Sequence, residues 1–274
     1  MSHTNRHVLP GFSLSLGYTM LYLGLLAIVP LIACFAKASS LSFAEISAAV
    51  WTPRALAAYR FSIGVSFASA VTSIVLGFVI AWVLVRYEFP LKRFFDALID
   101  LPFALPTAVA GLVYSALYVE NGWLGQFLVP LGIKAAYSRL AVLLVLTFLG
   151  IPFVVRTLQP VLESLEADTE EAAYLLGANR LQTFWRVLFP TLVPALVTGF
   201  ALSLARGLGE YGSVVFVSGN MPFQTEIAPV LIVSRLEEFA YAEATAIAVV
   251  LLLISFTLLV AINLLEAWSK RFYA

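Results

Sequence analysis

The chain has 274 residues, of which 61% are hydrophobic and 12% are charged, and its formal net charge is zero. A soluble globular domain carries about 25% charged residues, so the composition excludes an ordinary soluble protein and indicates an integral membrane protein. A neutral chain also offers no electrostatic attraction to nucleic acid, and we expect no such partner.

The few cysteine and histidine residues exclude several kinds of site. Cys34 is the single cysteine, so neither an intrachain disulfide nor a cysteine metal cluster can form. His3 and His7 both stand in the N-terminal tail. Catalysis by a histidine inside the fold and a zinc site of the usual ligand types are therefore excluded, and we expect no metal site.

The first apolar run is long enough to cross a membrane, which takes about 20 residues in a helix. It carries no charge from 8 to 36, and Pro10 and Gly11 at its entrance place the predicted span near 14–35. A cleaved signal peptide is the alternative, because Arg6 precedes the run and the residues after it mimic a cleavage site. The length of the run favours an uncleaved anchor.

The next two spans are predicted over 61–85 and from about 100 to 119. Glycine, serine and alanine residues in the second span would let neighbouring helices approach closely. The third span starts with the segment 100–106, where Pro106 predicts a kink or an irregular start. This segment is either an ordinary helix beginning or part of a gate.

Three further spans are predicted near 140–157, 192–217 and 244–265. Between the last two, the apolar piece 227–233 is too short to cross, and we expect it to pack on the outer face or to re-enter slightly. The pattern as a whole predicts an all-α polytopic membrane protein, in which six transmembrane helices form one transmembrane domain over 1–274.

The longest polar interruption lies between the fourth and fifth spans, within 159–191. Over 171–190, apolar residues recur at helical spacing with polar residues between them, which predicts amphipathic helix rather than a span. Gly177 is expected to divide it into two short helices, and Pro190 to stand in the first turn of the next helix. Taken alone, this pattern is typical of a helix that lies on the lipid surface.

Six spans place both termini on one side of the membrane, and the basic residues suggest which side that is. If the polar interruption is cytoplasmic, the cytoplasmic side holds more basic residues than the outside. They are Arg6, Arg86, Lys92, Arg93, Arg156, Arg180, Arg186, Lys270 and Arg271, against Lys37, Arg54, Arg60, Lys134, Arg139 and Arg235 outside. This bias has the sign of the positive-inside rule, so both termini are predicted to be cytoplasmic.

The polar interruption also carries a spaced motif. Its members are Glu171, Ala172, Ala173, Gly177, Val187 and Pro190. At this spacing they resemble the EAA loop of ABC importer permeases, although isoleucine is usual at Val187 and leucine at Phe189. In that family the loop is a coupling helix that docks into a groove on a cytoplasmic ATPase. The resemblance implies that these six residues couple the chain to such an ATPase.

The fifth predicted span contains two charged residues, Arg206 and Glu210, at a helical spacing that lets them pair. Charge inside the membrane is costly and by default marks a functional position, and Gly209 stands beside it. Three interpretations remain open. The pair fixes the geometry of the bundle, or the segment faces a translocation path with Arg206 attracting an anion, or it acts as a gate without touching the substrate.

Further stretches resemble one group of these permeases. Residues 100–111, 151–160 and 208–212 are similar to the sulfate, thiosulfate and molybdate permeases, with Tyr211 replacing a more usual phenylalanine. Residues 8–17, 219–220 and 235–239 resemble the T-type subunits of sulfate/thiosulfate importers. The likeness covers nearly the whole chain.

The resemblance implies a type I ABC importer permease fold (MetI-like) and the transport of sulfate or thiosulfate. It implies a W-type permease as heterodimer partner, a dimer of ATP-binding subunits and a periplasmic sulfate-binding protein, in a bacterial inner membrane or a plastid envelope. The chain has no phosphate-binding loop of the Walker type. We therefore expect it to be a channel-forming subunit and not an enzyme, with ATP and magnesium bound by the partner ATPase.

Three other functions remain as alternatives. The first is a permease for another oxyanion, such as molybdate or tungstate. A secondary anion transporter would need intramembrane carboxylates or broken helices, and Glu210 is the only acid well inside a predicted span. A membrane enzyme would need an acid–base or metal constellation, and the sparse polar residues form none.

Overall fold

The computed structural model describes residues 11–273, and within them every regular element is a helix. Five helices are long and apolar enough to cross a membrane: Phe12–Ser39, Pro53–Arg86, Arg139–Glu163, Arg180–Leu208 and Tyr241–Leu265. They confirm the all-α membrane prediction and the spans expected near 14–35, 61–85, 140–157 and 244–265. Arg6, His3 and His7 lie outside the described residues, as do the side chains of Lys270 and Arg271.

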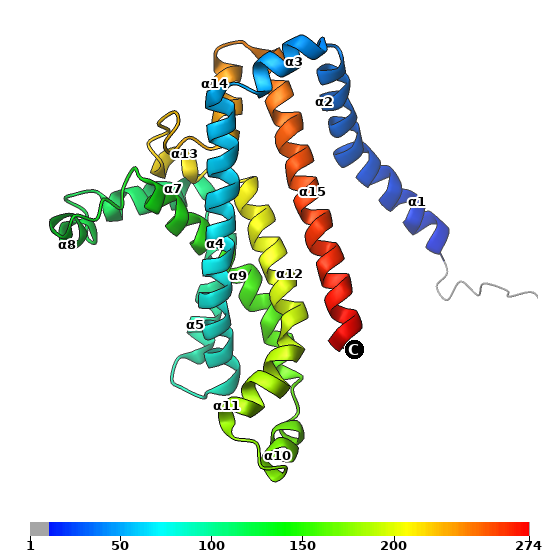
Figure 1. The fold of residues 1–274 in the computed structure, drawn as a ribbon, viewed down its shortest axis with the longest axis vertical. Helices are drawn as coiled ribbons and strands as arrows, with labels where there is room; N and C mark the ends of the chain where they lie inside the picture. Colours follow the sequence, from blue (N-terminus) through cyan, green and yellow to red (C-terminus); the bar gives the residue numbers. More distant parts are fainter. Residues whose placement is uncertain (1–10, 274) are drawn as a thin grey trace, which may run out of the picture.

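The first span stands apart from the rest of the molecule. It consists of α1 (Phe12–Leu23), the π-helical turn η1 (Gly24–Ile28) and α2 (Val29–Ser39). None of the residues of α1 is buried. Figure 1 shows this helix leaving the bundle at an angle, so that only its α2 end lies close to α15 (Tyr241–Tyr273). A short helix, α3 (Phe43–Val50), then leads into the bundle.

The core of the bundle is formed by α4 (Pro53–Arg86), α9 (Arg139–Glu163) and α12 (Phe189–Leu208), which pack along one another, with α15 against α12. Small residues permit this close packing, as the sequence suggested. A side chain at Gly77 would collide with Val154, and one at Gly150 with Ser203 and Ser73. The contact between these three helices therefore depends on residues without bulky side chains.

The fifth span ends earlier than the sequence suggested. Instead of continuing to residue 217, α12 stops at Leu208, and a non-helical stretch leads to the short helix α13 (Val214–Val217). Glycine at 207, 209 and 212 lowers the helical propensity here. In addition, the side chain of Glu210 accepts a hydrogen bond from the Ser213 backbone N–H at 2.8 Å, which satisfies this donor outside a helix.

The third predicted span is not one long helix. The predicted range, from about 100 to 119, is divided into α6 (Leu101–Ala104) and α7 (Thr107–Tyr118), and a further helix, α5 (Lys92–Ile99), precedes it. The break between α6 and α7 falls at Leu105 and Pro106, which confirms the irregular start predicted at that proline. The 12 residues of α7 are about 18 Å long, shorter than the ~30 Å hydrocarbon core of a bilayer. Two short helical turns, α8 (Gly125–Leu128) and η2 (Val129–Leu131), follow.

The polar interruption folds into a projection at one end of the bundle, which we call the hook (164–188). It contains α10 (Ala167–Leu175), α11 (Arg180–Thr183) and the π-helical turn η3 (Phe184–Leu188). Gly177 lies between α10 and α11, so the predicted division there is confirmed. At the opposite end of the bundle, α14 (Ala228–Glu237) packs against α4 and α15, as expected for an apolar piece too short to cross (Figure 1).

Candidate coupling site and intramembrane junction

The turn at Gly177 has the geometry of a helix C-terminal cap. Gly177 has a φ of +84°, a left-handed conformation that glycine adopts without steric cost. Its N–H donates to the Tyr174 carbonyl at 2.9 Å, and the Ala178 N–H donates to the Ala173 carbonyl at 3.0 Å. These two bonds form a Schellman motif that ends α10. The sharp turn that shapes the hook therefore depends on this glycine.

The second short helix of the hook starts with a reciprocal cap. The Gln182 N–H donates to the Asn179 side-chain oxygen, and the Asn179 N–H donates to the Gln182 side-chain oxygen, both at 2.9 Å. This capping box satisfies two backbone donors that a helix start leaves unpaired. Both turns of the hook are thus specified by local sequence.

The six motif residues, five in the hook and Pro190 in the first turn of α12, divide into two groups by exposure. Glu171, Ala172 and Gly177 are exposed, while Ala173 is buried and Val187 and Pro190 are half-buried. Large apolar side chains surround the exposed group. They are Tyr174, Leu175, Leu176, Leu181 and Trp185, and Leu176 is 89% exposed. An exposed apolar cluster on a projection is typical of a docking surface for another protein.

The inner face of the hook lies against the end of α4 and encloses a cleft of about 760 Å³. Glu170 on α10 forms an ion pair with Arg86, the last residue of α4, at 2.6 Å. Phe184 packs edge-on against Trp82 of α4 with 5.6 Å between ring centroids. The sequence did not reveal these contacts, because they join residues about a hundred positions apart.

The charged pair predicted in the fifth span forms, and its environment is asymmetric. Arg206 donates to one oxygen of the Glu210 carboxylate, and the Ser213 N–H and hydroxyl both donate to the other oxygen at 2.8 Å. The Glu210 side chain is 2% exposed, whereas that of Arg206 is 31% exposed. Gly209 is exposed beside them. The carboxylate is therefore fully engaged inside the protein, and the arginine is the accessible member.

This break in α12 lies against the broken third segment. A side chain at Gly111 of α7 would collide with the backbone of Ser213, and one at Gly212 would collide with Thr107. The Ser115 hydroxyl of α7 donates to the Phe216 carbonyl of α13 at 2.8 Å. We call this contact of α7 with the stretch from Gly209 to α13 the junction. The glycine and serine content was visible in the sequence, but the partners were not.

A second charged cluster fastens α5 and α6 to α9. Arg156 donates one hydrogen bond to the Asp96 carboxylate at 2.7 Å and two to the Asp100 carboxylate at 2.9 and 2.7 Å. Gln159 also donates to Asp96 at 2.9 Å. The hydrogen bonds from Gln159 and from Arg156 lower the pKa of the Asp96 carboxyl group, because they stabilise its charged form.

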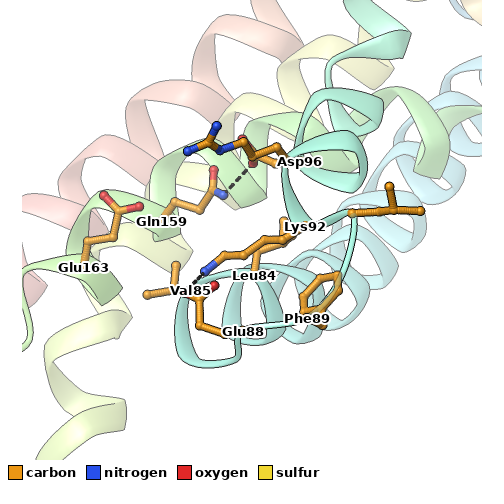
Figure 2. Close-up of a pocket in the computed structure, with 10 residues that line it drawn as sticks. Leu84, Val85, Glu88, Phe89, Lys92, Asp96, Gln159 and Glu163 are labelled. Atoms are coloured by element: carbon orange, nitrogen blue, oxygen red, sulfur yellow. Dashed lines mark hydrogen bonds and ion pairs between the residues drawn. The ribbon is translucent and has the colours of Figure 1, made fainter.

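Figure 2 shows Asp96 and Gln159 lining a cleft of about 690 Å³, with Glu163 on the same helix as Gln159, α9. Lys92 lies on α5, as Asp96 does, and forms an ion pair with Glu88 at 2.7 Å. The segment 100–106 is thus anchored through Asp100 to α9. No group of three or more metal-ligating side chains occurs in the part of the chain that the structure describes.

Comparisons with a family model and with individual proteins agree on one family for this chain. The family model described as "Binding-protein-dependent transport system inner membrane component" matches residues 73–272. The "Sulfate transport system permease protein CysT" of Synechococcus elongatus is 49% identical over 255 residues, covering 93% of this chain and 92% of that protein. The protein of the same name from Salmonella typhimurium is 47% identical, covering 98% of this chain and 97% of its own.

Solved structures agree at the level of the fold. A chain of a bacterial alginate ABC transporter in complex with a pentasaccharide-bound periplasmic protein aligns with a TM-score of 0.73 at 16% identity, covering 95% of this chain and 94% of its own. A chain of the MetNI methionine ABC transporter aligns with a TM-score of 0.55 at 17% identity, covering 78% and 93%. The resemblance read from the sequence is thereby confirmed: this chain belongs to the family of binding-protein-dependent transport system inner membrane components.

Proposed function

We propose that this chain is a permease subunit of an ABC importer that moves sulfate or thiosulfate across the membrane, driven by ATP hydrolysis on partner subunits. The observation that carries the proposal is the near-full-length likeness, at 47% and 49% identity, to permeases named for sulfate transport. A permease for molybdate or tungstate is the alternative, because in the family that the sequence resembles the binding protein largely selects the oxyanion.

The chain acts as a channel-forming subunit, and ATP and magnesium bind to the partner ATPase. The exposed apolar cluster of the hook supports this division, since it offers a surface on which another protein can dock. Glu171, Ala172 and Gly177 are exposed, so an ATPase can contact them directly. Ala173 is buried and Val187 and Pro190 are half-buried, so these three contribute by shaping the hook and the start of α12.

The remaining partners are a W-type permease, with which this chain forms a heterodimer, and a periplasmic binding protein loaded with the anion. The first helix supports a partner within the membrane, because α1 buries none of its residues against its own chain. Lipid can also cover such an apolar surface, so the main support for the heterodimer is the resemblance to the permease family.

The chain crosses the membrane six times, with both termini in the cytoplasm of a bacterium; a plastid envelope is the alternative location. The direction of the helices supports the sixth crossing. The C-terminal ends of α4 and α9 both lie at the hook, since Arg86 pairs with Glu170 and α9 runs into the hook. Two consecutive long helices that point the same way need a return between them, and only the stretch of α6 and α7 can supply it.

The junction is the place where the translocation path opens. Arg206 is partly exposed beside the junction, Gly209 is exposed within it, and Glu210 holds the break after α12 through Ser213. A broken helix alone would also suit a secondary transporter, but the state of the Glu210 carboxylate argues against one. A proton-coupled transporter needs a carboxylate that can exchange protons with solvent, whereas Glu210 is buried and bound on both oxygens.

The proposal is tested by reconstituting the chain in liposomes with the W-type permease, the ATPase and the sulfate-binding protein. Labelled sulfate uptake and ATP hydrolysis are measured with and without sulfate, and again with molybdate. Uptake that requires ATP and all partners, with hydrolysis stimulated by sulfate, is the expected result. Stimulation by molybdate alone would move the substrate to that oxyanion, and uptake driven by an ion gradient without the ATPase would overturn the proposal.

A further inference from the structure

The hook is joined by the polypeptide to only two of the three helices in the core. The helix α9 runs into it and α12 leaves from it, whereas α4 ends at Arg86 and the chain then turns away into α5. A displacement of the hook would therefore act directly on α9 and α12. It can act on the cytoplasmic end of α4 only through contacts between side chains.

Two such contacts are present, and they adjoin each other. The Arg86 guanidinium pairs with Glu170 at 2.6 Å and lies over the Trp82 ring, 5.1 Å from its centroid. The second contact is between aromatic rings. Phe184 of the hook packs against Trp82 and Phe78 of α4, with 5.6 and 6.1 Å between ring centroids. The ion pair is partly shielded, with 25% and 35% of its side chains exposed. Such shielding makes a charge pair stronger than one on an open surface.

Glu170 occupies a position well suited to passing on a displacement. It lies on α10 directly before the exposed Glu171 of the motif, and its own carboxylate pairs with Arg86 of α4. The Nε and Nη2 atoms of Arg86 are buried and have no hydrogen-bond partner among the described residues, and the remaining nitrogen, Nη1, lies against Glu170. Glu170 is thus the carboxylate on which this guanidinium depends.

The opposite end of α4 is also held by hydrogen bonds, to the segment that contains Glu226 and Ala228. Arg54 holds Glu226 with two hydrogen bonds of 2.9 and 2.7 Å, and Glu226 is 2% exposed. The Ser62 hydroxyl accepts a hydrogen bond from the Ala228 N–H at 2.7 Å, at the start of α14. The 34 residues of α4, roughly 50 Å of helix, therefore connect the hook with the segment at the far end of the bundle.

We propose that Arg86 and Glu170, supported by Trp82 and Phe184, are positioning residues that make α4 move together with the hook. Through this contact, a displacement of the hook moves α4 together with α9 and α12. The movement of α4 then reaches α14. The inference rests on the proposed function, because it assumes that an ATPase displaces the hook. Neither residue belongs to the motif that resembles the EAA loop.

The test compares single and double variants in the complete transporter reconstituted in liposomes. Arg86→Gln, Glu170→Gln and the double variant are measured for assembly with the ATPase, for ATP hydrolysis and for sulfate uptake. We expect the complex to assemble and to hydrolyse ATP, while the sulfate taken up per ATP falls about fivefold, within the usual range of coupling between sites. The double variant should be no worse than either single variant, since all three break the same contact.

Two further variants make the result specific. Arg86→Lys keeps the charge over the ring and should restore most of the lost uptake per ATP. Glu88→Gln removes an exposed ion pair of the same length next to the hook, between Glu88 and Lys92, and should change nothing. Normal uptake per ATP in Arg86→Gln, or losses that add in the double variant, would overturn the inference. A wild-type complex without ATP-driven uptake would instead overturn the proposed function.

Discussion

At the scale of single residues, Gly177 is the position where backbone conformation matters most for the hook. A side chain there would meet nothing within 4 Å, so its cost comes from the φ of +84° and not from crowding. Gly177→Ala should destabilise the turn by about 1 kcal/mol, and Gly177→Asn by less, because asparagine tolerates the left-handed region. Gly177→Asp should in addition disturb docking of the ATPase, since it adds a charge to the exposed face.

This prediction is checked by hydrogen exchange of the hook amides and by uptake per ATP. Gly64→Ala is the matched control, because Gly64 also has open space around it but lies within the regular helix α4. Exchange should be faster in the hook of Gly177→Ala and unchanged in the control. Equal exchange in Gly177→Ala and Gly177→Asn would mean that the left-handed turn is not the reason for the glycine.

The second residue-scale prediction separates the roles of Arg206 and Glu210. Arg206→Gln leaves a buried carboxylate without its counter-ion, and we expect a loss of about 3 kcal/mol in stability. The double variant Arg206→Gln/Glu210→Gln removes both charges and should recover most of that loss. If Arg206 faces the translocation path, the double variant should still fail to take up sulfate.

Thermal unfolding in detergent and sulfate uptake in liposomes are the two measurements. A double variant that regains both stability and uptake would show that the pair only fixes the geometry of the bundle. A variant that regains neither would mean that the hydrogen bonds from Ser213 need the ionised carboxylate. The result thus separates a pair that only fixes the geometry of the bundle from a pair that acts in the translocation path or as its gate.

At the scale of elements, the attachment of α5 and α6 to α9 should depend on pH. Hydrogen bonds from Gln159 and Arg156 lower the pKa of Asp96 in the folded protein. A lowered pKa means that this carboxylate stabilises the fold above its ordinary pKa of about 3.9, and that the stabilisation is lost as pH falls through the lower folded-state value. Acidification should therefore loosen α5 from α9.

The melting temperature of the wild type and of Asp96→Asn, measured in detergent from about pH 7 down to about pH 3, tests this pH dependence. The difference between the two proteins should be largest near neutral pH and should shrink at the acid end. Other carboxylates titrate in both proteins and cancel in the comparison. A difference that stays constant over the whole range would exclude a role for the charge of Asp96.

The elements that the sequence predicted well are those with a local cause. Charge-free runs located four spans, Pro106 located a break, and Gly177 located the division of the hook. The end of α12 was predicted too late because the apolar run continues past Leu208. The helix itself stops there, and the Ser213 N–H donates to the Glu210 side chain instead of to a helical carbonyl. Contacts such as Ser115 with Phe216 and Arg156 with Asp96 depend on how distant helices pack, and no local pattern encodes that.

At the scale of the whole molecule, the structure connects its two ends through α4. The hook carries exposed apolar side chains, and α14 at the other end is held to α4 by Arg54 and Ser62 (Figure 1). A transporter has to relate an event on one face of the membrane to an event on the other. A long helix fastened near both ends meets this requirement without any change in its own internal hydrogen bonds.

The number of crossings decides whether the hook and the loop before α9 lie on opposite faces of the membrane. In a Cys34→Ala background, Leu176→Cys places a thiol on the exposed tip of the hook, and Leu131→Cys places one on η2, where the leucine is 73% exposed. With six crossings, a membrane-impermeant maleimide should label position 131 only from outside and position 176 only after the inner face is opened. Labelling of both positions from the same face would mean that α6 and α7 do not cross, and α4 and α9 could not then both end at the hook.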